Sequence, residues 1–336
     1  MQAWSLTHPA PVGQNPLELR EIPEPEPGPG QVRVRVRACG ICRTDLHLVE
    51  GELPLRREHV TPGHQVVGEI TALGTGVEQL RQGQRVGVAW LHQTCGVCRF
   101  CRADQENLCE RAEFTGWTVP GGYAEALLAA ADFVYPIPEG LDDLQAAPLL
   151  CAGIIGYRCL RLCGIAPGAW PGAKLGIYGF GAAGHIAIQI ARFRGAEVFV
   201  CTRDHSRHQR LARELGAAWV GDAAATPPVL LDAALMFAPA GELVPPALRA
   251  LDAGGTLVLG GIHLSCIPPL HYNWLYRERV IRSVANNTRA DGREFLAEAQ
   301  LAGVNTRIQK FPFSHANQAL AALKNDAIAG AGVLAL

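Results

Sequence analysis

The chain has 336 residues, of which 49% are hydrophobic and 18% are charged, and its formal net charge is −1. That length is enough for two domains with sizeable cores. The near-neutral charge argues against nucleic acid or an anionic membrane surface as a partner. No apolar run approaches the roughly 18–20 residues of a membrane span, and no signal-peptide pattern opens the chain. We therefore expect a cytoplasmic protein.

The first half of the chain has the pattern of a mainly-β domain. Residues 31–37 alternate strictly between polar side chains and valine, which predicts a half-buried strand. This strand delivers Cys39 at its end, where a side chain can face a cleft. Short apolar segments at 66–70 and 85–89, separated by regular glycines, are typical of further strands.

A lobe at about residues 91–112 carries four cysteines: Cys95, Cys98, Cys101 and Cys109. Four thiolates this close together suit a closed tetrahedral site, and the absence of an open position favours structural zinc. The chain has 11 cysteines, an odd number, and their clustering favours metal thiolates in a reducing compartment over disulfides. Five others are expected to be small buried hydrophobic residues: Cys42, Cys159, Cys163, Cys201 and Cys266.

The second half begins with a strand–turn–helix–strand pattern. An apolar run at 174–178 leads into a Gly-x-Gly-x-x-Gly sequence, followed by helical spacing to residue 194 and a strand at 197–202. In this context the glycines predict a dinucleotide cradle, with the pyrophosphate at the helix N-terminus. The cradle residues are Gly179, Phe180, Gly181, Ala182, Ala183 and Gly184.

The end of the second strand of this unit indicates which nicotinamide cofactor is used. NAD-binding members of such folds usually place an acidic residue there, on the ribose hydroxyls. Counting forward from Gly195-Ala196 places Arg203 at that position, so Thr202, Arg203 and Arg207 favour the 2′-phosphate of NADP. The alternative is NAD, because a shift of one residue would put Asp204 at the acidic position.

Further strands at 230–237 and 255–262 alternate with helical segments, which predicts a doubly wound parallel sheet. The last 50 residues have the patterns of a helix, a strand and a second helix. We expect this segment to belong to the first domain. We therefore expect an α/β protein of two domains, residues 1–152 with 287–336 and residues 153–286.

Several motifs together resemble the zinc-containing medium-chain alcohol dehydrogenase family. They are the segment 39–47 (CGICRTDLH), the Gly63-His64 pair and the four-cysteine lobe, and they follow the family's order over essentially the whole chain. The resemblance implies a GroES-like catalytic domain, a Rossmann cofactor domain and a homodimer or homotetramer. It implies two zinc ions per chain, with the catalytic zinc held by Cys39, His64 and Cys151.

The resemblance also assigns roles around that zinc. Thr44 would touch the alcohol, Asp45 would receive the His64 ring N–H, and His47 would end a proton relay. The ordinary alternatives are a helix cap for Thr44 and an exposed helix histidine for His47. Arg43, Gly261 and Ile262 would contact the cofactor. Leu53, Trp90, Leu91 and Trp117 would line the substrate pocket, unless they are ordinary core residues.

Two positions depart from the family pattern. Gln65 stands where the family usually has a glutamate next to the ligand histidine, which would leave the zinc slightly more Lewis-acidic. Ala331 stands where the family usually has an arginine on the pyrophosphate, so Arg43 would carry more of that charge.

The function implied is a zinc-dependent alcohol dehydrogenase or aldehyde reductase that acts on primary or aromatic alcohols. One alternative is a zinc-free quinone or enoyl reductase of the same fold. Another is a non-catalytic protein that binds a partner through its zinc lobe. The physiological substrate and the preferred direction of the reaction stay open.

Overall fold

The computed structural model describes residues 1–336, which divide into two units. The first contains residues 1–151, 288–297 and 306–336, and the second contains residues 152–287 and 298–305. The chain crosses between them at 151/152 and 287/288, each one residue from the expected boundary. Residues 298–305 differ from the expectation, which placed them in the first unit. They belong to the second unit because Glu298 forms an ion pair with Arg194 (2.7 Å) and Asn305 donates its backbone N–H to Gln189 (2.9 Å).

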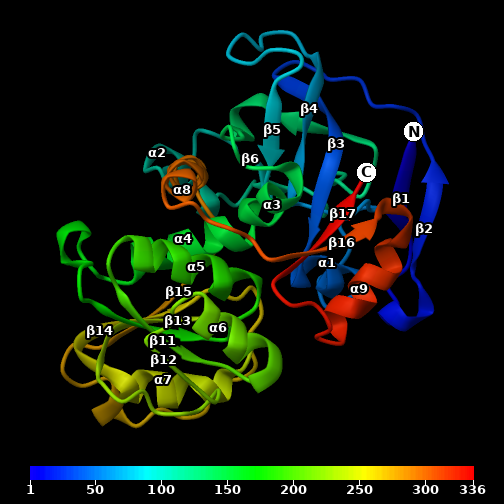
Figure 1. Cartoon of the computed structure of the whole chain (residues 1–336). Helices are drawn as coiled ribbons and strands as arrows, with labels where there is room; N and C mark the ends of the chain where they lie inside the picture. Colours follow the sequence, from blue (N-terminus) through cyan, green and yellow to red (C-terminus); the bar gives the residue numbers. More distant parts are fainter. The chain divides into compact units, whose positions relative to one another are not determined.

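The first unit is built on a seven-stranded sheet (Figure 1). Its order is β16-β17-β3-β4-β5-β9, and β8 also pairs with β3. All pairings are antiparallel except that of β16 with β17. The strands of this sheet are β3 (Gln31–Ile41), β4 (Val66–Leu73), β5 (Arg85–Val88), β8 (Ala126–Ala130), β9 (Val134–Pro136), β16 (Ile308–Pro312) and β17 (Ala331–Ala335). Two separate pairs complete the unit: β1 (Gln2–Leu6) with β2 (Leu17–Glu21), and β6 (Leu91–Gln93) with β7 (Glu113–Phe114).

The central strand β3 shows why the alternating sequence forms this sheet. Val32, Val34 and Val36 are buried in the core of the unit, and the intervening arginines point to the other face. Arg35 and Arg37 both reach Glu69 on the neighbouring strand β4. The strand therefore buries one face and neutralises charge on the other, as its period of two predicts.

The helices of the first unit are short. They are α1 (Arg43–Val49), α2 (Arg99–Arg102), α3 (Asp143–Ala146) and α9 (Ala316–Lys324), with α8 (Arg289–Leu301) starting in this unit and ending in the second. Single 3₁₀ turns lie between them: η1 (Val12–Gln14), η2 (Glu106–Leu108), η3 (Ala131–Phe133), η4 (Ala147–Leu150) and η9 (Phe313–His315).

The second unit is a doubly wound parallel sheet, which confirms the predicted fold class. Its order is β12-β11-β10-β13-β14-β15, and every pairing is parallel. The strands are β10 (Lys174–Tyr178), β11 (Glu197–Cys201), β12 (Trp219–Gly221), β13 (Leu231–Met236), β14 (Leu251–Leu259) and β15 (Val280–Ser283). The helices are α4 (Ala152–Leu162), α5 (Ala182–Phe193), α6 (Arg210–Glu214) and α7 (Val244–Ala250), with short turns η5 (Pro167–Ala169), η6 (His205–Gln209), η7 (Gly241–Leu243) and η8 (Tyr272–Trp274).

The order of this sheet determines where a ligand can bind. The strand order reverses between β10 and β13, because the chain first builds outward to β12 and then returns to the other side of β10. In open parallel sheets the crevice beyond the carboxyl ends of the strands at such a reversal is the binding position. The glycine-rich turn after Tyr178 lies at this position.

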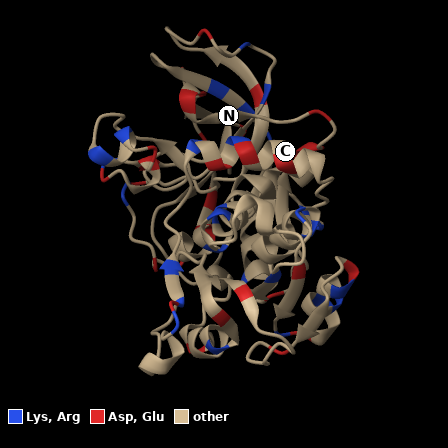
Figure 2. Cartoon of the chain, turned by 90° about the vertical axis from the view of Figure 1, so that its left-hand side faces the viewer, with Lys and Arg blue, Asp and Glu red and all other residues tan.

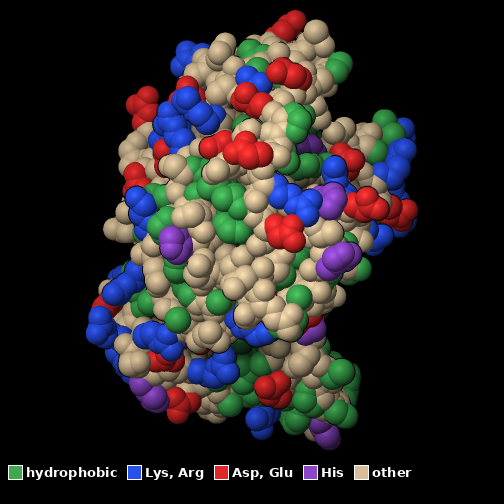
Figure 3. All heavy atoms as spheres, turned by 90° about the vertical axis from the view of Figure 1, so that its right-hand side faces the viewer, with side chains coloured by type: hydrophobic (Ala, Val, Ile, Leu, Met, Phe, Trp, Pro, Cys, Tyr) green, Lys and Arg blue, Asp and Glu red, His purple; other side chains and the backbone are tan.

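The charged residues are mixed rather than gathered by sign. Figure 2 shows basic and acidic residues along the same elements, and Figure 3 shows them next to one another on one face. Pairs such as Arg85–Asp143 and Arg20–Glu18, each at 2.6 Å, neutralise part of this charge locally. No helix combines the length and the apolar character needed to cross a membrane.

Candidate active site

The first site begins where β3 ends and α1 starts. Cys42 lies in extended conformation just before the helix, and its backbone N–H donates to the Asp45 carboxylate (2.9 Å). An acidic side chain in the first turn that accepts from the cap residue is half of a capping box, which stabilises a helix start. The turn holds the Cys42 thiol at the end of the strand.

Three metal-binding side chains meet at this point: Cys42, His64 and Cys151. Their ligand atoms all lie within 4.8 Å of one another, and the two sulfurs are 3.9 Å apart. The pKa of the Cys42 thiol is lowered well below its usual value, because a hydrogen bond with Cys151 and the neighbouring His64 outweigh the effect of burial. Two sulfurs and one imidazole match a catalytic zinc set that keeps its fourth position open.

The expectation that Cys39 is a ligand of the catalytic zinc is wrong, because Cys42 lies with His64 and Cys151 instead. Cys39 is 0% exposed, its Sγ lies 3.6 Å from the Gly40 carbonyl oxygen, and it is part of the hydrophobic core. A Cβ atom on Gly63 would come within 2.9 Å of the Cys39 sulfur, so the thiol is enclosed by packed chain. The reason is that β3 continues to Ile41, which leaves Cys39 inside the strand. Cys42, which we expected to be a buried hydrophobic residue, takes the place beside His64.

The Asp45 carboxylate fixes the orientation of His64. Its Oδ1 accepts from His64 Nδ1 (3.0 Å) and from the Gly63 backbone N–H (3.1 Å), and the side chains of Asp45 and His64 are 2% and 1% exposed. Burial alone lowers the pKa of His64, but the carboxylate and the Cys42 sulfur raise it to about 10. Because Nδ1 is held by the carboxylate, Nε2 is the nitrogen left for a metal.

The other expected residues of α1 lie near this group. Thr44 is buried, with its Oγ1 3.7 Å from the Cys42 sulfur. His47 is partly exposed and hydrogen-bonds through Nδ1 to the Glu52 carboxylate. Arg43 is 48% exposed and lies 3.8 Å from Asp326. Nothing in the local sequence pattern pointed to Glu52 as a partner of His47 or to Asp326 as a partner of Arg43.

Gln65, the departure from the family pattern, is buried beside β3. A Cβ atom on Gly40 would lie 2.9 Å from the Gln65 Cβ, and the Gly40 N–H donates to the Gln65 carbonyl (2.8 Å). The Gln65 side chain therefore occupies the space that the glycine leaves, next to the histidine of the cluster. Its amide is neutral, so it adds no charge to the site.

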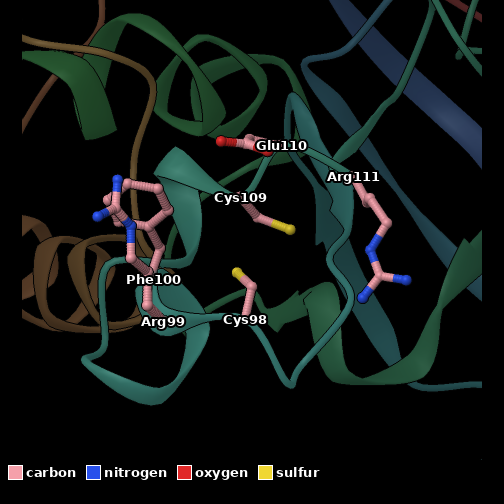
Figure 4. A pocket seen from close by; sticks show the side chains of 6 residues that line it. All are labelled: Cys98, Arg99, Phe100, Cys109, Glu110 and Arg111. Atoms are coloured by element: carbon pink, nitrogen blue, oxygen red, sulfur yellow. The ribbon is translucent and has the colours of Figure 1, made fainter.

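The four cysteines of the lobe also come together. The ligand atoms of Cys95, Cys98, Cys101 and Cys109 all lie within 4.8 Å of one another, with Cys98 and Cys101 sulfurs 3.5 Å apart. Figure 4 shows the thiols of Cys98 and Cys109 facing each other. Backbone N–H groups of Val97 and Cys98 lower the pKa of Cys95 to about 6. A set of four sulfurs with backbone N–H donors fits a closed structural zinc site.

An aromatic cluster lies next to His64. The Trp90 ring is stacked with Trp117 (5.9 Å, 11°) and with Phe114 (5.3 Å, 28°), and it meets the His64 ring edge-on at 4.9 Å. The Trp117 indole N–H donates to the Pro54 carbonyl (2.8 Å). Phe114 was not among the expected pocket residues, because its strand β7 has only two residues and no periodic signal.

Leu91 lies behind this cluster. It is 0% exposed and packs in a small core with Ala130 and Phe133, against which Phe114 of the aromatic cluster also packs. Leu91 follows Trp90 directly at the start of a strand, where successive side chains point to opposite faces. The expectation that Leu91 lines the substrate pocket stays a prediction. Leu53 is half-buried and packs against the main core of the first unit.

The glycines of the second unit form the expected strand–turn–helix. Gly179 has φ +88°, and a Cβ there would lie 2.7 Å from the Ala238 backbone nitrogen. A Cβ on Gly184 would lie 2.7 Å from the Gly179 carbonyl oxygen, whereas nothing lies within 4 Å of one on Gly181. Gly179 thus permits the turn, Gly184 permits close packing, and Gly181 leaves open space at the start of α5. Phe180, Ala182 and Ala183 complete this turn.

The residues after β11 are arranged around Asp204. Its φ is +64°, and its carboxylate accepts from the backbone N–H groups of Ser206 (3.1 Å) and Arg207 (3.0 Å) and from Arg207 Nε (2.6 Å). The Asp204 carboxylate is therefore hydrogen-bonded within its own turn. Thr202 is buried, and Arg203 is exposed.

Gly261 and Ile262 follow the end of β14, and both are exposed. The carboxyl end of a parallel strand is the edge at which such sheets bind ligands. The two residues therefore lie at the edge of the sheet that also carries the glycine-rich turn.

Comparison with known proteins gives matches over nearly the whole chain. Residues 28–139 match the family described as "Alcohol dehydrogenase GroES-like domain", and residues 182–300 match "Zinc-binding dehydrogenase". The chain is 48% identical to the "Probable alcohol dehydrogenase AdhA" of Mycobacterium tuberculosis, over 99% of this chain and 97% of that protein.

Solved structures of the same fold are also similar. A cinnamyl alcohol dehydrogenase of Sorghum bicolor is 28% identical with a TM-score of 0.88, over 99% of this chain and 97% of that one. An acetophenone reductase of Geotrichum candidum, solved with NAD, is 26% identical with a TM-score of 0.87, over 100% of this chain and 97% of that one. The chain therefore belongs to the zinc-containing medium-chain alcohol dehydrogenase family and is an oxidoreductase that acts on alcohols.

Proposed function

We propose that this chain transfers hydride reversibly between a primary or aromatic alcohol and NADP, with two zinc ions per chain. The observation that carries the proposal is the meeting of Cys42, His64 and Cys151 within 4.8 Å, with Asp45 behind the histidine. One zinc would be held by these three residues and the other by Cys95, Cys98, Cys101 and Cys109. The first supplies Lewis-acid stabilisation of negative charge on the substrate oxygen, and the nicotinamide supplies the hydride chemistry.

The residues of α1 handle the proton of the alcohol. Thr44 is buried beside Cys42, and its hydroxyl can accept one proton while it donates another. His47 is partly exposed, so its ring can exchange a proton with water. Thr44 would therefore hold the substrate hydroxyl, and His47 would deliver the proton to solvent. Asp45 is a positioning residue, because it touches the histidine ring rather than the substrate.

The cofactor proposal rests on the turn after β11. Asp204 is occupied by Ser206 and Arg207, so the acidic residue that would favour NAD is engaged elsewhere. Arg203 is exposed and has the charge and the planar donors that suit a 2′-phosphate. Arg207, which we expected to share this role, donates its Nε to Asp204, so Arg203 is the main candidate. Gly261 and Ile262 are proposed to lie against the nicotinamide half. The role of Arg43 at the cofactor stays a prediction, and its guanidinium lies 3.8 Å from the Asp326 carboxylate.

The substrate class follows from the aromatic cluster. Trp90 and Trp117 are stacked on each other, and Trp117 is fixed by its bond to Pro54, so they make a rigid apolar wall beside a metal ligand. Such a wall favours alcohols with an apolar or aromatic group over polyols, which need several polar partners. The similarity to a cinnamyl alcohol dehydrogenase supports the same class.

A homodimer or homotetramer is the proposed assembly. Strand β15 pairs with β14 on one side only and exposes Val280, and the segment that leads to it exposes Tyr272 and Tyr276. An unpaired edge with exposed apolar side chains beside it is a surface that another chain can cover. The cytoplasm is the proposed location, because two clusters of thiols suit metal binding in a reducing compartment.

A panel of alcohols and aldehydes, read by the absorbance of the reduced nicotinamide, tests the function. We expect turnover with aromatic and primary alcohols and a higher kcat/KM with NADPH than with NADH. The zinc content of the same preparation separates the alternatives: about two ions per chain are expected. Turnover of quinones or enones by a protein with no zinc would establish the zinc-free reductase instead. Full zinc content with no turnover of any alcohol or aldehyde would favour the non-catalytic protein.

A further inference from the structure

A buried tyrosine lies behind the carboxylate that orients His64. Tyr123 is fully buried, and its hydroxyl donates to Asp45 Oδ2 at 3.4 Å. The other oxygen, Asp45 Oδ1, accepts from His64 Nδ1 (3.0 Å) and from the Gly63 backbone N–H (3.1 Å). The tyrosine hydroxyl and the imidazole therefore bind different oxygens of one carboxylate, and Tyr123 stands one hydrogen bond further from the metal position than Asp45.

The backbone places this tyrosine ring by joining two segments of the first unit. Tyr123 donates its backbone N–H to the Pro62 carbonyl (2.9 Å), and Gly122 donates to the Gly63 carbonyl (2.8 Å). Gly63 has φ +98°, and a Cβ atom there would lie 2.4 Å from Tyr123 Cδ1. The glycine before His64 therefore permits the turn and also leaves the space that the tyrosine ring fills.

The tyrosine hydroxyl completes the set of donors around the Asp45 carboxylate. The Cys42 backbone N–H also donates to Asp45 Oδ2 (2.9 Å), so each carboxylate oxygen accepts two hydrogen bonds. Asp45 is 2% exposed, and a carboxylate with so little access to water depends on its protein donors. The bond from Tyr123 is the longest of the set, so we expect its contribution to be the smallest.

We propose that Tyr123 is a positioning residue of the cluster formed by Cys42, His64 and Cys151. Its hydroxyl fixes the orientation of the Asp45 carboxylate, and the carboxylate in turn holds the His64 ring with Nε2 toward the metal. The inference rests on the proposed catalytic zinc and adds a residue that acts through Asp45. The alternative role is that of an ordinary core residue, because the Tyr123 ring also packs in the core of the first unit.

The test is the variant Tyr123→Phe, which removes the hydroxyl and keeps the ring beside Gly63. We expect the zinc affinity of the cluster to fall about fivefold, which is the size of one net hydrogen bond and less than the loss of a direct partner of a metal ligand. Competition with a chelator on the purified full-length protein measures this affinity. The four-cysteine lobe should keep its zinc.

Tyr135→Phe is the matched control. Tyr135 is also a buried tyrosine of the first unit, but its ring lies beside α8, where a Cβ atom on Gly292 would come within 2.4 Å of it. This variant should keep the wild-type zinc affinity of the cluster. With cobalt in place of zinc, the ligand-field bands of the cluster should shift in Tyr123→Phe and stay unchanged in Tyr135→Phe.

A double-mutant cycle separates action through Asp45 from a general loosening of the core. In the Asp45→Asn background, Tyr123→Phe should lower the zinc affinity by less than about twofold, because the charged acceptor of the hydroxyl is already gone. A full, additive loss in that background would overturn the inference. Wild-type affinity and wild-type cobalt bands in the single variant Tyr123→Phe would also overturn it. A wild-type cluster that binds neither zinc nor cobalt would instead overturn the proposed catalytic zinc, so the two failures are distinguishable.

Discussion

The two sulfur clusters of the first unit are built in opposite ways. Cys42, His64 and Cys151 come from three distant parts of the chain, two of them are partly buried and one is fully buried, and a carboxylate supports them. The four cysteines of the lobe come from residues 95–109, and backbone N–H groups support them. A site that must keep an open position needs the fold to hold it, whereas a closed site can be made by one loop. Substitutions at the first cluster should therefore alter chemistry, and those at the second should alter stability.

The largest effect is expected for Thr44→Val, which removes the hydroxyl beside Cys42 and keeps the volume. Because general acid–base groups contribute about 10²–10⁴-fold, kcat should fall by that factor. Zinc content and Tm should stay at the wild-type values, as measured by mass spectrometry and calorimetry. A kcat within a factor of two of wild type would show that Thr44 only caps the helix.

Cys109→Ser should have the opposite effects, with stability lowered and kcat nearly unchanged. Loss of a metal site is among the mechanisms that give large destabilisation, and a free energy of unfolding lower by about 3 kcal/mol is expected. One zinc per chain should be lost, while kcat of the remaining folded protein changes little. Chemical denaturation and metal analysis measure both quantities. The control is Cys266→Ser, an exposed thiol outside both clusters. An unchanged unfolding curve for Cys109→Ser would contradict the claim that the four-cysteine lobe stabilises the fold.

Asp45→Asn tests whether the first cluster depends on the carboxylate of Asp45. The amide can still accept from the Gly63 N–H, but it is a weaker acceptor for the His64 Nδ1–H than the carboxylate, so it fixes the ring with Nε2 toward the metal less firmly. We expect the zinc affinity of this cluster to fall about 10–100-fold, as for other partners of metal ligands. Competition with a chelator measures the affinity, and Asp143→Asn, at a surface pair with Arg85, is the control. Equal affinities for both variants would count against the assigned role.

Arg203→Gln lies outside both clusters and should leave zinc content and Tm unchanged. Loss of a charge-assisted hydrogen bond to the 2′-phosphate, worth about 1.5 kcal/mol, would lower the NADPH to NADH ratio of kcat/KM by roughly tenfold. Arg210→Gln is the matched control, because Arg210 is exposed on the next helix and pairs with Glu214 (2.9 Å). If both variants keep the wild-type ratio of kcat/KM, Arg203 does not bind the 2′-phosphate and the NADP proposal is contradicted.

The same contrast explains what could be predicted from the sequence. The grouping of the four cysteines and the glycine-rich turn can be predicted from the sequence, because their residues are close in the chain and spacing alone brings them together. The ligand beside His64 could not be read this way. Cys39 and Cys42 are three residues apart, and the choice depends on the strand continuing to Ile41, which is decided by its pairing with β17 and β4.

Long-range packing accounts for the other differences. Leu91 is buried in a small core with Ala130 and Phe133, and its pairing with Phe114 on β7 joins segments more than 20 residues apart in the chain. Residues 298–305 join the second unit through ion pairs and hydrogen bonds with α5, more than 100 residues earlier in the sequence. Phe114 lies in a segment without periodicity, so no local pattern marks its contacts with Trp90 and Trp117.

The identity of the catalytic zinc ligand is tested most directly by metal analysis of two variants, Cys42→Ser and Cys39→Ser. The geometry predicts that Cys42→Ser loses one zinc per chain together with turnover, and that Cys39→Ser keeps the zinc content and the turnover of the wild type. Loss of zinc from Cys39→Ser, with full zinc in Cys42→Ser, would contradict the assignment of Cys42, His64 and Cys151 as the metal centre.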